Sequence, residues 1–143
     1  GESAGIASLL RGRGGAMADL NLDGLLDLAV VNRQGPLELY QNITRGAGNW
    51  LAVKLRQAAP NRDAIGAWIE VRVGDYMFAR ELTVGGGHAG GQITAEHFGL
   101  GLALSAQIRV IWPDQTVSDW QEVGAGKAVF LTRNATGLKV SVY

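Results

Sequence analysis

Four side chains with oxygen ligands recur at short intervals near the start of this chain, and their spacing is typical of cation binding. Asp19, Asn21, Asp23 and Asp27 stand at positions one, three, five and nine of a single segment. A hard cation such as Ca²⁺ takes about six to eight oxygen ligands from carboxylates, amides and backbone carbonyls. The residues between these four are apolar or small, so the segment does not resemble a solvated acidic loop. It predicts a Ca²⁺ site.

Two further residues complete the predicted site. Gly24 permits a sharp turn at position six, and the backbone carbonyl of Leu25 is the natural backbone ligand. Because Asn21 replaces a carboxylate, the site has three acids, which favours a modest affinity. We expect Ca²⁺ to raise thermal stability. The alternative is a bare Asx/Gly turn between two strands, with its acids facing water.

The segment begins like an EF-hand loop but does not end like one. The EF-hand requires a bidentate Glu at position twelve, where this chain has Val30, and it requires flanking helices. Here residues 28–31 are Leu-Ala-Val-Val, a short run typical of a buried strand. The sequence therefore predicts a calcium loop that opens a strand.

Composition limits the protein classes to which this chain belongs. Its 143 residues include 13 basic and 13 acidic side chains, so the net charge is zero and general electrostatics favours neither nucleic acid nor an anionic membrane as a partner. The 21 glycines and many short Val/Ile/Leu runs favour an all-β domain, and the lack of cysteine excludes disulfides. No apolar run is long enough for a spanning helix, and we expect no signal peptide within the chain.

Alternation of apolar and polar residues predicts about ten short strands and little helix. In residues 49–56, for example, Leu51, Val53 and Leu55 share one face. We expect a β-sandwich or open barrel of short antiparallel strands in residues 48–143, preceded by a separate β-segment in residues 1–47. The predicted strands are 16–18, 28–32, 37–41, 49–56, 67–73, 76–84, 107–112, 117–123, 128–133 and 138–142.

The first segment resembles an FG-GAP/VCBS repeat, a blade of a β-propeller. The resemblance runs from Gly15-Ala16-Met17-Ala18-Asp19 through residues 27–32 to Leu39-Tyr40-Gln41-Asn42. In that family an Asp-rich loop binds Ca²⁺ between two blade strands, which implies ligand roles for Asp19, Asn21, Asp23 and Asp27. Propeller blades usually have four strands, and only about three are present here.

The second segment resembles an ASPIC/UnbV domain, which follows FG-GAP repeats in known proteins. The matching stretches are Asn49-Trp50-Leu51-Ala52-Val53-Lys54-Leu55, Asn61-Arg62-Asp63-Ala64-Ile65-Gly66-Ala67, His97-Phe98-Gly99-Leu100-Gly101 and Val110-Ile111-Trp112-Pro113-Asp114. The resemblance implies an N-terminal partial propeller-blade segment joined to a β domain.

A partial blade leaves strand edges without partners, and natural proteins cover or pair such edges. We therefore expect residues 15–42 to pack against the second segment or to pair with another chain. The second possibility implies a homo-oligomer formed through the edge of the partial blade.

Other candidate sites have simpler interpretations. The glycine-rich residues 85–91 could bind phosphate, but no Lys-Ser/Thr follows them, so a loop between strands is the better account. His88 has no acidic neighbour in the sequence. We expect His97 to be a buried ring at a tight turn, and Arg62 to pair locally with Asp63.

We expect a non-enzymatic, calcium-stabilised binding or adhesion module that works outside the cell or at its surface, with an unknown protein or glycan as partner. An alternative is a carbohydrate-binding module that uses exposed tryptophans, although core packing is the simpler reading for Trp50 and Trp112. A third hypothesis is a hydrolase that uses His88 with a nearby acid.

Overall fold

The computed structural model describes residues 5–86, 91 and 94–143, and in these residues it contains eleven β-strands and no helix. It confirms the all-β class. In the described residues, no helix has the length and apolarity that a membrane span requires. The chain folds as two compact units, one formed by Gly1–Arg45 with Val84–Ile93 and the other by Gly46–Thr83 with Thr94–Tyr143.

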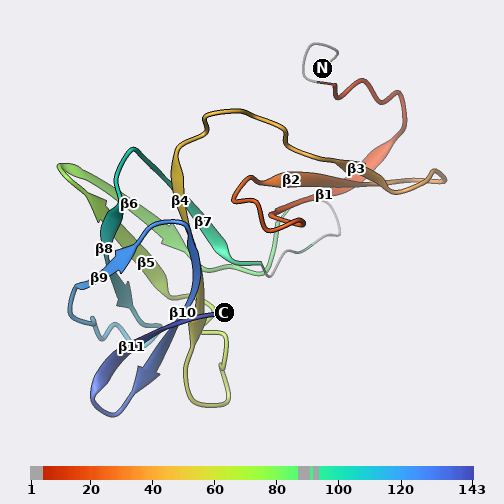
Figure 1. The fold of residues 1–143 in the computed structure, drawn as a ribbon. Helices are drawn as coiled ribbons and strands as arrows, with labels where there is room; N and C mark the ends of the chain where they lie inside the picture. The colour runs from red at the N-terminus through yellow and green to blue at the C-terminus, as the bar shows by residue number, and fades with distance from the viewer. Residues whose placement is uncertain (1–4, 87–90, 92–93) are drawn as a thin grey trace. The chain divides into compact units, whose positions relative to one another are not determined.

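The first unit contains a three-stranded antiparallel sheet in the order β1-β2-β3. Its strands are β1 (Gly12–Ala18), β2 (Asp27–Asn32) and β3 (Glu38–Tyr40), as expected for this region (Figure 1). Ala18 pairs with Asp27, so the predicted calcium loop is the connection between β1 and β2. The strand that follows the loop agrees with the exclusion of an EF-hand.

One sheet of the second unit has the order β11-β10-β4-β7. Its strands are β4 (Asn49–Arg56), β7 (Glu96–Gly101), β10 (Lys127–Asn134) and β11 (Gly137–Val142). Most neighbours are antiparallel, but β4 and β10 pair in parallel. The central pair of this sheet thus joins the first strand of the unit to its last hairpin (Figure 1).

The other sheet of the second unit has the order β6-β5-β8-β9 and is antiparallel throughout. It comprises β5 (Trp68–Val73), β6 (Tyr76–Glu81), β8 (Ser105–Ile111) and β9 (Gln121–Gly124). Val73 pairs with Tyr76, so the expected hairpin between β5 and β6 is present. Gly74 takes a φ of 56° in this two-residue turn, which suits a residue without a Cβ.

Apolar residues from both sheets form one core, and this packing makes the second unit a β-sandwich. On β4 the alternate residues Leu51, Val53 and Leu55 are buried, as their spacing predicts. The facing sheet contributes Ile69 and Val71 in the same way. Further buried members of this core are Phe98, Leu100, Ile108, Val110, Trp112, Val123, Val129 and Leu131.

Two elements differ from the sequence prediction. The stretch around His97 forms strand β7 and not a tight turn, because Phe98 and Leu100 alternate inward with glycines between them. The strand predicted over residues 117–123 is shorter, and β9 begins only at Gln121, while Val117 forms an isolated bridge to Ile111.

Candidate functional site

The loop between β1 and β2 gathers the predicted ligand side chains around a tight turn. The carboxylate of Asp19 accepts hydrogen bonds from the backbone N–H groups of Asp23 at 3.1 Å and Gly24 at 2.8 Å. The Oδ1 of Asn21 accepts from the same N–H of Asp23 at 3.3 Å. Two of the predicted oxygen ligands therefore converge on one backbone group.

Asp23 and the residues beside it close the same turn. Its Oδ1 accepts from the N–H of Leu25 at 2.9 Å, and its Oδ2 accepts from the side-chain amide of Asn21 at 2.8 Å. Leu22 and Gly24 have φ values of 62° and 88°, so two residues in left-handed conformations reverse the chain. Leu25, the predicted backbone ligand, thus lies in the turn that holds the side-chain oxygens.

Asp27 is the buried acid of the site, with an exposure of 3%. Its Oδ2 accepts from the N–H of Leu20 at 3.0 Å, and its Oδ1 accepts from the N–H of Asn42 at 2.8 Å. The side chain of Asn42 in turn donates to the carbonyl of Leu26 at 3.2 Å. Asp27 therefore joins the start of the loop, β2 and the segment after β3.

The chemistry of these donors fits a hard cation, because every side chain offers oxygen and none offers sulfur or imidazole. Their oxygens, however, hydrogen-bond to backbone amides and to the amide of Asn21. In the described residues, no group of three or more His, Cys, Asp or Glu side chains is gathered in a form ready to hold a metal ion. Binding of a cation would require these carboxylates to turn from the amides.

Replacement of Asp27 by Asn is expected to cost the first unit about 1–3 kcal/mol, because one buried acceptor becomes a donor that faces a backbone N–H. The matched control is Asp23→Asn, an exposed member of the same loop, with an expected cost below about 0.5 kcal/mol. Amide hydrogen exchange at Leu20 and Asn42, measured with a chelator present, reports the loss. Unchanged protection in the Asp27 variant would contradict the bonding described.

Asn42 was not among the predicted site residues. The signal for it is weak, because it lies 15 residues from Asp27 and follows a three-residue strand. Its backbone contact depends on the pairing of β2 with β3, in which Leu28 lies opposite Tyr40. Local spacing does not contain that information.

The two histidines have different outcomes. His88 and the centre of the glycine-rich loop lie outside the described residues. His97 lies on β7 and is only partly buried, so the expectation of a buried ring at a tight turn is wrong. Its ring stacks on that of Trp50, with centroids 5.7 Å apart and an angle of 14° between the planes.

The motif Asn61-Arg62-Asp63 forms a loop that is closed by the side chain of Asn61. The amide of Asn61 donates to the carbonyl of Ile65 at 2.9 Å and accepts from its N–H at 3.0 Å. The expected pairing of Arg62 with Asp63 is wrong, because no ion pair joins them within the described part of the chain. Backbone closure by one asparagine holds this loop without a local charge pair.

A polar pocket of about 520 Å³ lies beside this loop, between the Pro60 region and the β10–β11 hairpin. Asp114 and Arg133 form an ion pair in its lining at 2.8 Å, and Arg133 also donates to the hydroxyl of Thr116. The hydrogen bond from Arg133 holds the pKa of the Asp114 carboxyl well below its ordinary value, with help from Thr116. The pair is therefore charged throughout the physiological range of pH.

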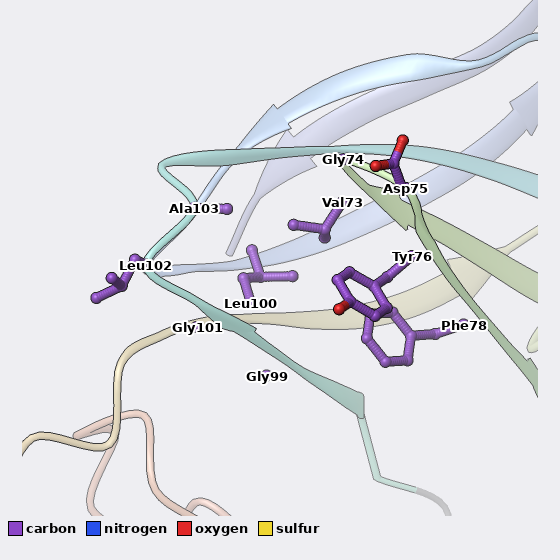
Figure 2. Close-up of a pocket in the computed structure, with 10 residues that line it drawn as sticks. All are labelled: Val73, Gly74, Asp75, Tyr76, Phe78, Gly99, Leu100, Gly101, Leu102 and Ala103. Atoms are coloured by element: carbon purple, nitrogen blue, oxygen red, sulfur yellow. The ribbon is translucent and has the colours of Figure 1, made fainter.

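An apolar pocket of about 810 Å³ opens between the edge strands β6 and β7, and sequence reasoning missed it. Figure 2 shows Val73, Leu100, Tyr76 and Phe78 around this space, with Leu102 turned away. Tyr76 and Phe78 alternate along β6 and are 75% and 42% exposed. The alternation of two aromatic residues after the β5–β6 turn is the signal that could have indicated it.

The four tryptophans differ in exposure, and only Trp68, at the start of β5, is exposed, at 41%. Trp112 is 3% exposed and lies in the core, as predicted. Trp50 points away from the core, since its neighbour Leu51 points inward, so the expectation of core packing is wrong for Trp50. Trp120 packs against two guanidinium groups, those of Arg72 at 4.4 Å and Arg109 at 4.5 Å.

Comparison with known proteins gives one family match and a set of distant relatives. The sequence model of the ASPIC and UnbV family matches residues 57–138. Cartilage acidic protein 1 of Mus musculus is 30% identical over 109 residues, which are 73% of this chain and 17% of that protein. The human protein of the same name has the same identity over the same length and is covered to 16%. The chain thus spans about a sixth of the length of these relatives. No solved structure matches the chain significantly.

Proposed function

The chain belongs to the ASPIC and UnbV family, and we propose that it is a non-enzymatic, calcium-stabilised module for binding or adhesion outside the cell or at its surface. The observation that carries the proposal is the loop between β1 and β2, in which Asp19, Asn21 and Asp23 close the turn by hydrogen bonds while Asp27, at the start of β2, holds the N–H of Leu20. All four side chains offer oxygen, and they lie within nine residues of one another. This arrangement supports a structural cation site.

Asp19, Asn21, Asp23 and Asp27 would hold the ion, with the carbonyl of Leu25 as backbone ligand. Bound Ca²⁺ supplies positive charge that links acids from both ends of the turn. The chain itself contributes the reversal at the turn and the anchoring of Asp27 to the N–H groups of Leu20 and Asn42. Those contacts fix the ends of the loop, so only the few residues between them would have to become ordered when an ion binds.

The chemistry of the loop supports a location outside the cell. A loop with three carboxylates that must leave their amide partners suits the weak affinities of extracellular modules, with Kd values of about 10⁻⁴–10⁻³ M. The similarity to cartilage acidic protein 1 covers most of the chain, although only a small part of that protein. The full-length relatives therefore say little about the binding partner of this chain. We propose that the partner is a protein or a glycan.

The first unit also offers a route to assembly. Its sheet has the order β1-β2-β3, so β1 and β3 are edge strands within that sheet. Edge strands present unpaired backbone groups that readily pair with another chain. This supports the proposal that the partial FG-GAP-like blade is completed by further strands, either in a longer chain or in a second copy.

Thermal unfolding in millimolar Ca²⁺, in millimolar Mg²⁺ and in a chelator tests the calcium proposal. Ca²⁺ at about tenfold above its Kd should stabilise the first unit by about 1.4 kcal/mol, which is a rise of a few degrees in its Tm. Mg²⁺ should have a smaller effect because it demands a tighter octahedral arrangement.

A control distinguishes Ca²⁺ binding at the loop from a general effect of negative charge on the Ca²⁺ response. The double variant Asp19→Asn/Asp23→Asn should lose the Ca²⁺ response, whereas Asp63→Asn/Asp119→Asn, which removes two exposed acids elsewhere, should keep it. Coincident unfolding curves with Ca²⁺ and with chelator would refute the site. Equal loss in both double variants would show that the response is not specific to the loop.

A further inference from the structure

The outer face of the sheet β11-β10-β4-β7 carries positive charge without compensating acids. Leu55 points into the core, so its neighbours Lys54 and Arg56 point outward, and Lys139 on β11 belongs to the same face. The outward positions of these four strands, all of them described, hold no Asp or Glu. We call Lys54, Arg56 and Lys139 the basic face.

Aromatic rings hold two of these cations in place. The guanidinium of Arg56 lies 3.6 Å from the ring centroid of Phe130, and the ammonium of Lys54 lies 5.3 Å from that of Tyr143. The two rings also contact each other, with centroids 4.4 Å apart. Such contacts orient a cation without neutralising it. Within the described part of the chain, no ion pair engages Lys54, Arg56 or Lys139.

The register of the strands sets the spacing of the three backbone positions. Lys54 and Arg56 are two residues apart on one strand, which separates their Cα atoms by about 7 Å. Thr132 pairs with both Arg56 and Lys139, so the Cα atoms of these two residues lie about 10 Å apart across three strands. The basic face therefore distributes its cations over β4 and β11 and is not built as a single pocket for one ion.

The opposite sheet shows that this arrangement is not a general property of the protein. Its outward residues also include two arginines that pack on an aromatic ring, Arg72 and Arg109 on Trp120. There, however, Glu70 forms an ion pair with Arg109, and further acids lie on the same sheet. The zero net charge of the chain thus conceals one face that is basic and one that is mixed.

We propose that the basic face binds an acidic polysaccharide, whose carboxylate or sulfate groups pair with Lys54, Arg56 and Lys139. The inference rests on the binding function proposed above and names the class of partner, but it does not depend on calcium. Charge complementarity selects a polyanion, and the separation of the cations suits charges repeated along a chain. The forked guanidinium of Arg56 suits planar or branched oxyanions.

The aromatic residues argue against single-stranded nucleic acid as the partner. Bases require open ring faces on which to stack. On this face Arg56 covers one side of Phe130, and Trp50 is already stacked on His97. The rings therefore present cations to a ligand and do not form a platform for bases.

Binding of a heparin dodecasaccharide, which carries both carboxylate and sulfate groups, tests the proposal by calorimetry at physiological salt with a chelator present. The variant Lys54→Gln/Arg56→Gln/Lys139→Gln is expected to weaken binding at least about tenfold. The control Arg62→Gln/Arg72→Gln/Lys127→Gln removes the same charge from exposed positions elsewhere and should change Kd by less than about threefold. Dextran of the same length should not bind.

The proposal would be overturned if heparin did not bind or if both triple variants weakened its binding equally. It would also be overturned if a dodecamer of thymidylate bound as tightly as heparin and lost that binding in the first triple variant. The single variant Lys139→Glu guards against misfolding, because this exposed side chain lies on an edge strand. It should weaken heparin binding while leaving the Tm unchanged. Since the titration contains chelator, failure here and failure of the calcium response are separate results.

Discussion

Alanine in place of Phe98 is expected to lower the free energy of unfolding of the second unit by about 3–5 kcal/mol. Phe98 is only 2% exposed and is among the largest fully enclosed side chains of the sandwich core. Truncation removes its burial and leaves a cavity that close-packed neighbours on two sheets cannot fill. Urea unfolding followed by tryptophan fluorescence measures the loss, since the core also contains Trp112.

Phe78→Ala is the matched control, because it makes the same chemical change on the facing sheet. Phe78 is 42% exposed and lines the open apolar pocket, so its replacement should cost less than about 1.5 kcal/mol (Figure 2). Similar losses in the two variants would mean that β7 does not pack into the core as described.

The second large effect concerns the backbone at Gly48, and Gly48→Ala is expected to cost about 2–5 kcal/mol. Gly48 has a φ of 83°, and an added Cβ would lie 2.8 Å from the carbonyl oxygen of Gly101. The left-handed conformation alone costs about 1–2 kcal/mol, and the steric conflict with backbone adds to it. Thermal unfolding of the second unit measures the total.

Gly46→Ala isolates the conformational part of that cost. Gly46 has a φ of 68°, but an added Cβ would meet nothing within 4 Å. Its replacement should therefore cost only about 1–2 kcal/mol. If Gly46→Ala and Gly48→Ala unfold at the same temperature, the close approach of Gly48 to β7 is not the reason that glycine is needed at position 48.

The strands that the sequence predicted well are those that bury one face. In β5 and β8, β-branched residues alternate mostly with polar ones, and in β4 and β10 the leucines and valines recur at every second position; in all four strands the structure buries this set. Period-two alternation is a direct consequence of strand geometry, so the local sequence contains it. This is why the all-β class and most strand positions could be predicted.

β7 was missed for an equally local reason. Gly99 and Gly101 occupy its outward positions, and glycine is the residue most typical of turns. The inward residues Phe98 and Leu100 were present in the sequence, but the outward ones lacked the polar side chains that mark a strand. Gly101 does have a φ of 59°, so the strand ends where glycine is needed.

The candidate calcium loop could be predicted in its composition but not in its anchoring. Asp19, Asn21 and Asp23 act within a few residues, and their spacing determines which backbone amides they reach. The partner of Asp27 at Asn42 depends on the pairing of β2 with β3. Register between strands is a property of the folded sheet and is only weakly encoded in local patterns.

The parallel pairing of β4 with β10 has a consequence for how this protein is made. β4 leaves the ribosome at the start of the second unit, well before β10, the strand that lies beside it. Until β10 emerges, the nascent chain carries a central strand with one unpaired edge and a strongly apolar face. The sandwich cannot be completed before β10 is made, and chains that stop before it would expose this strand to aggregation.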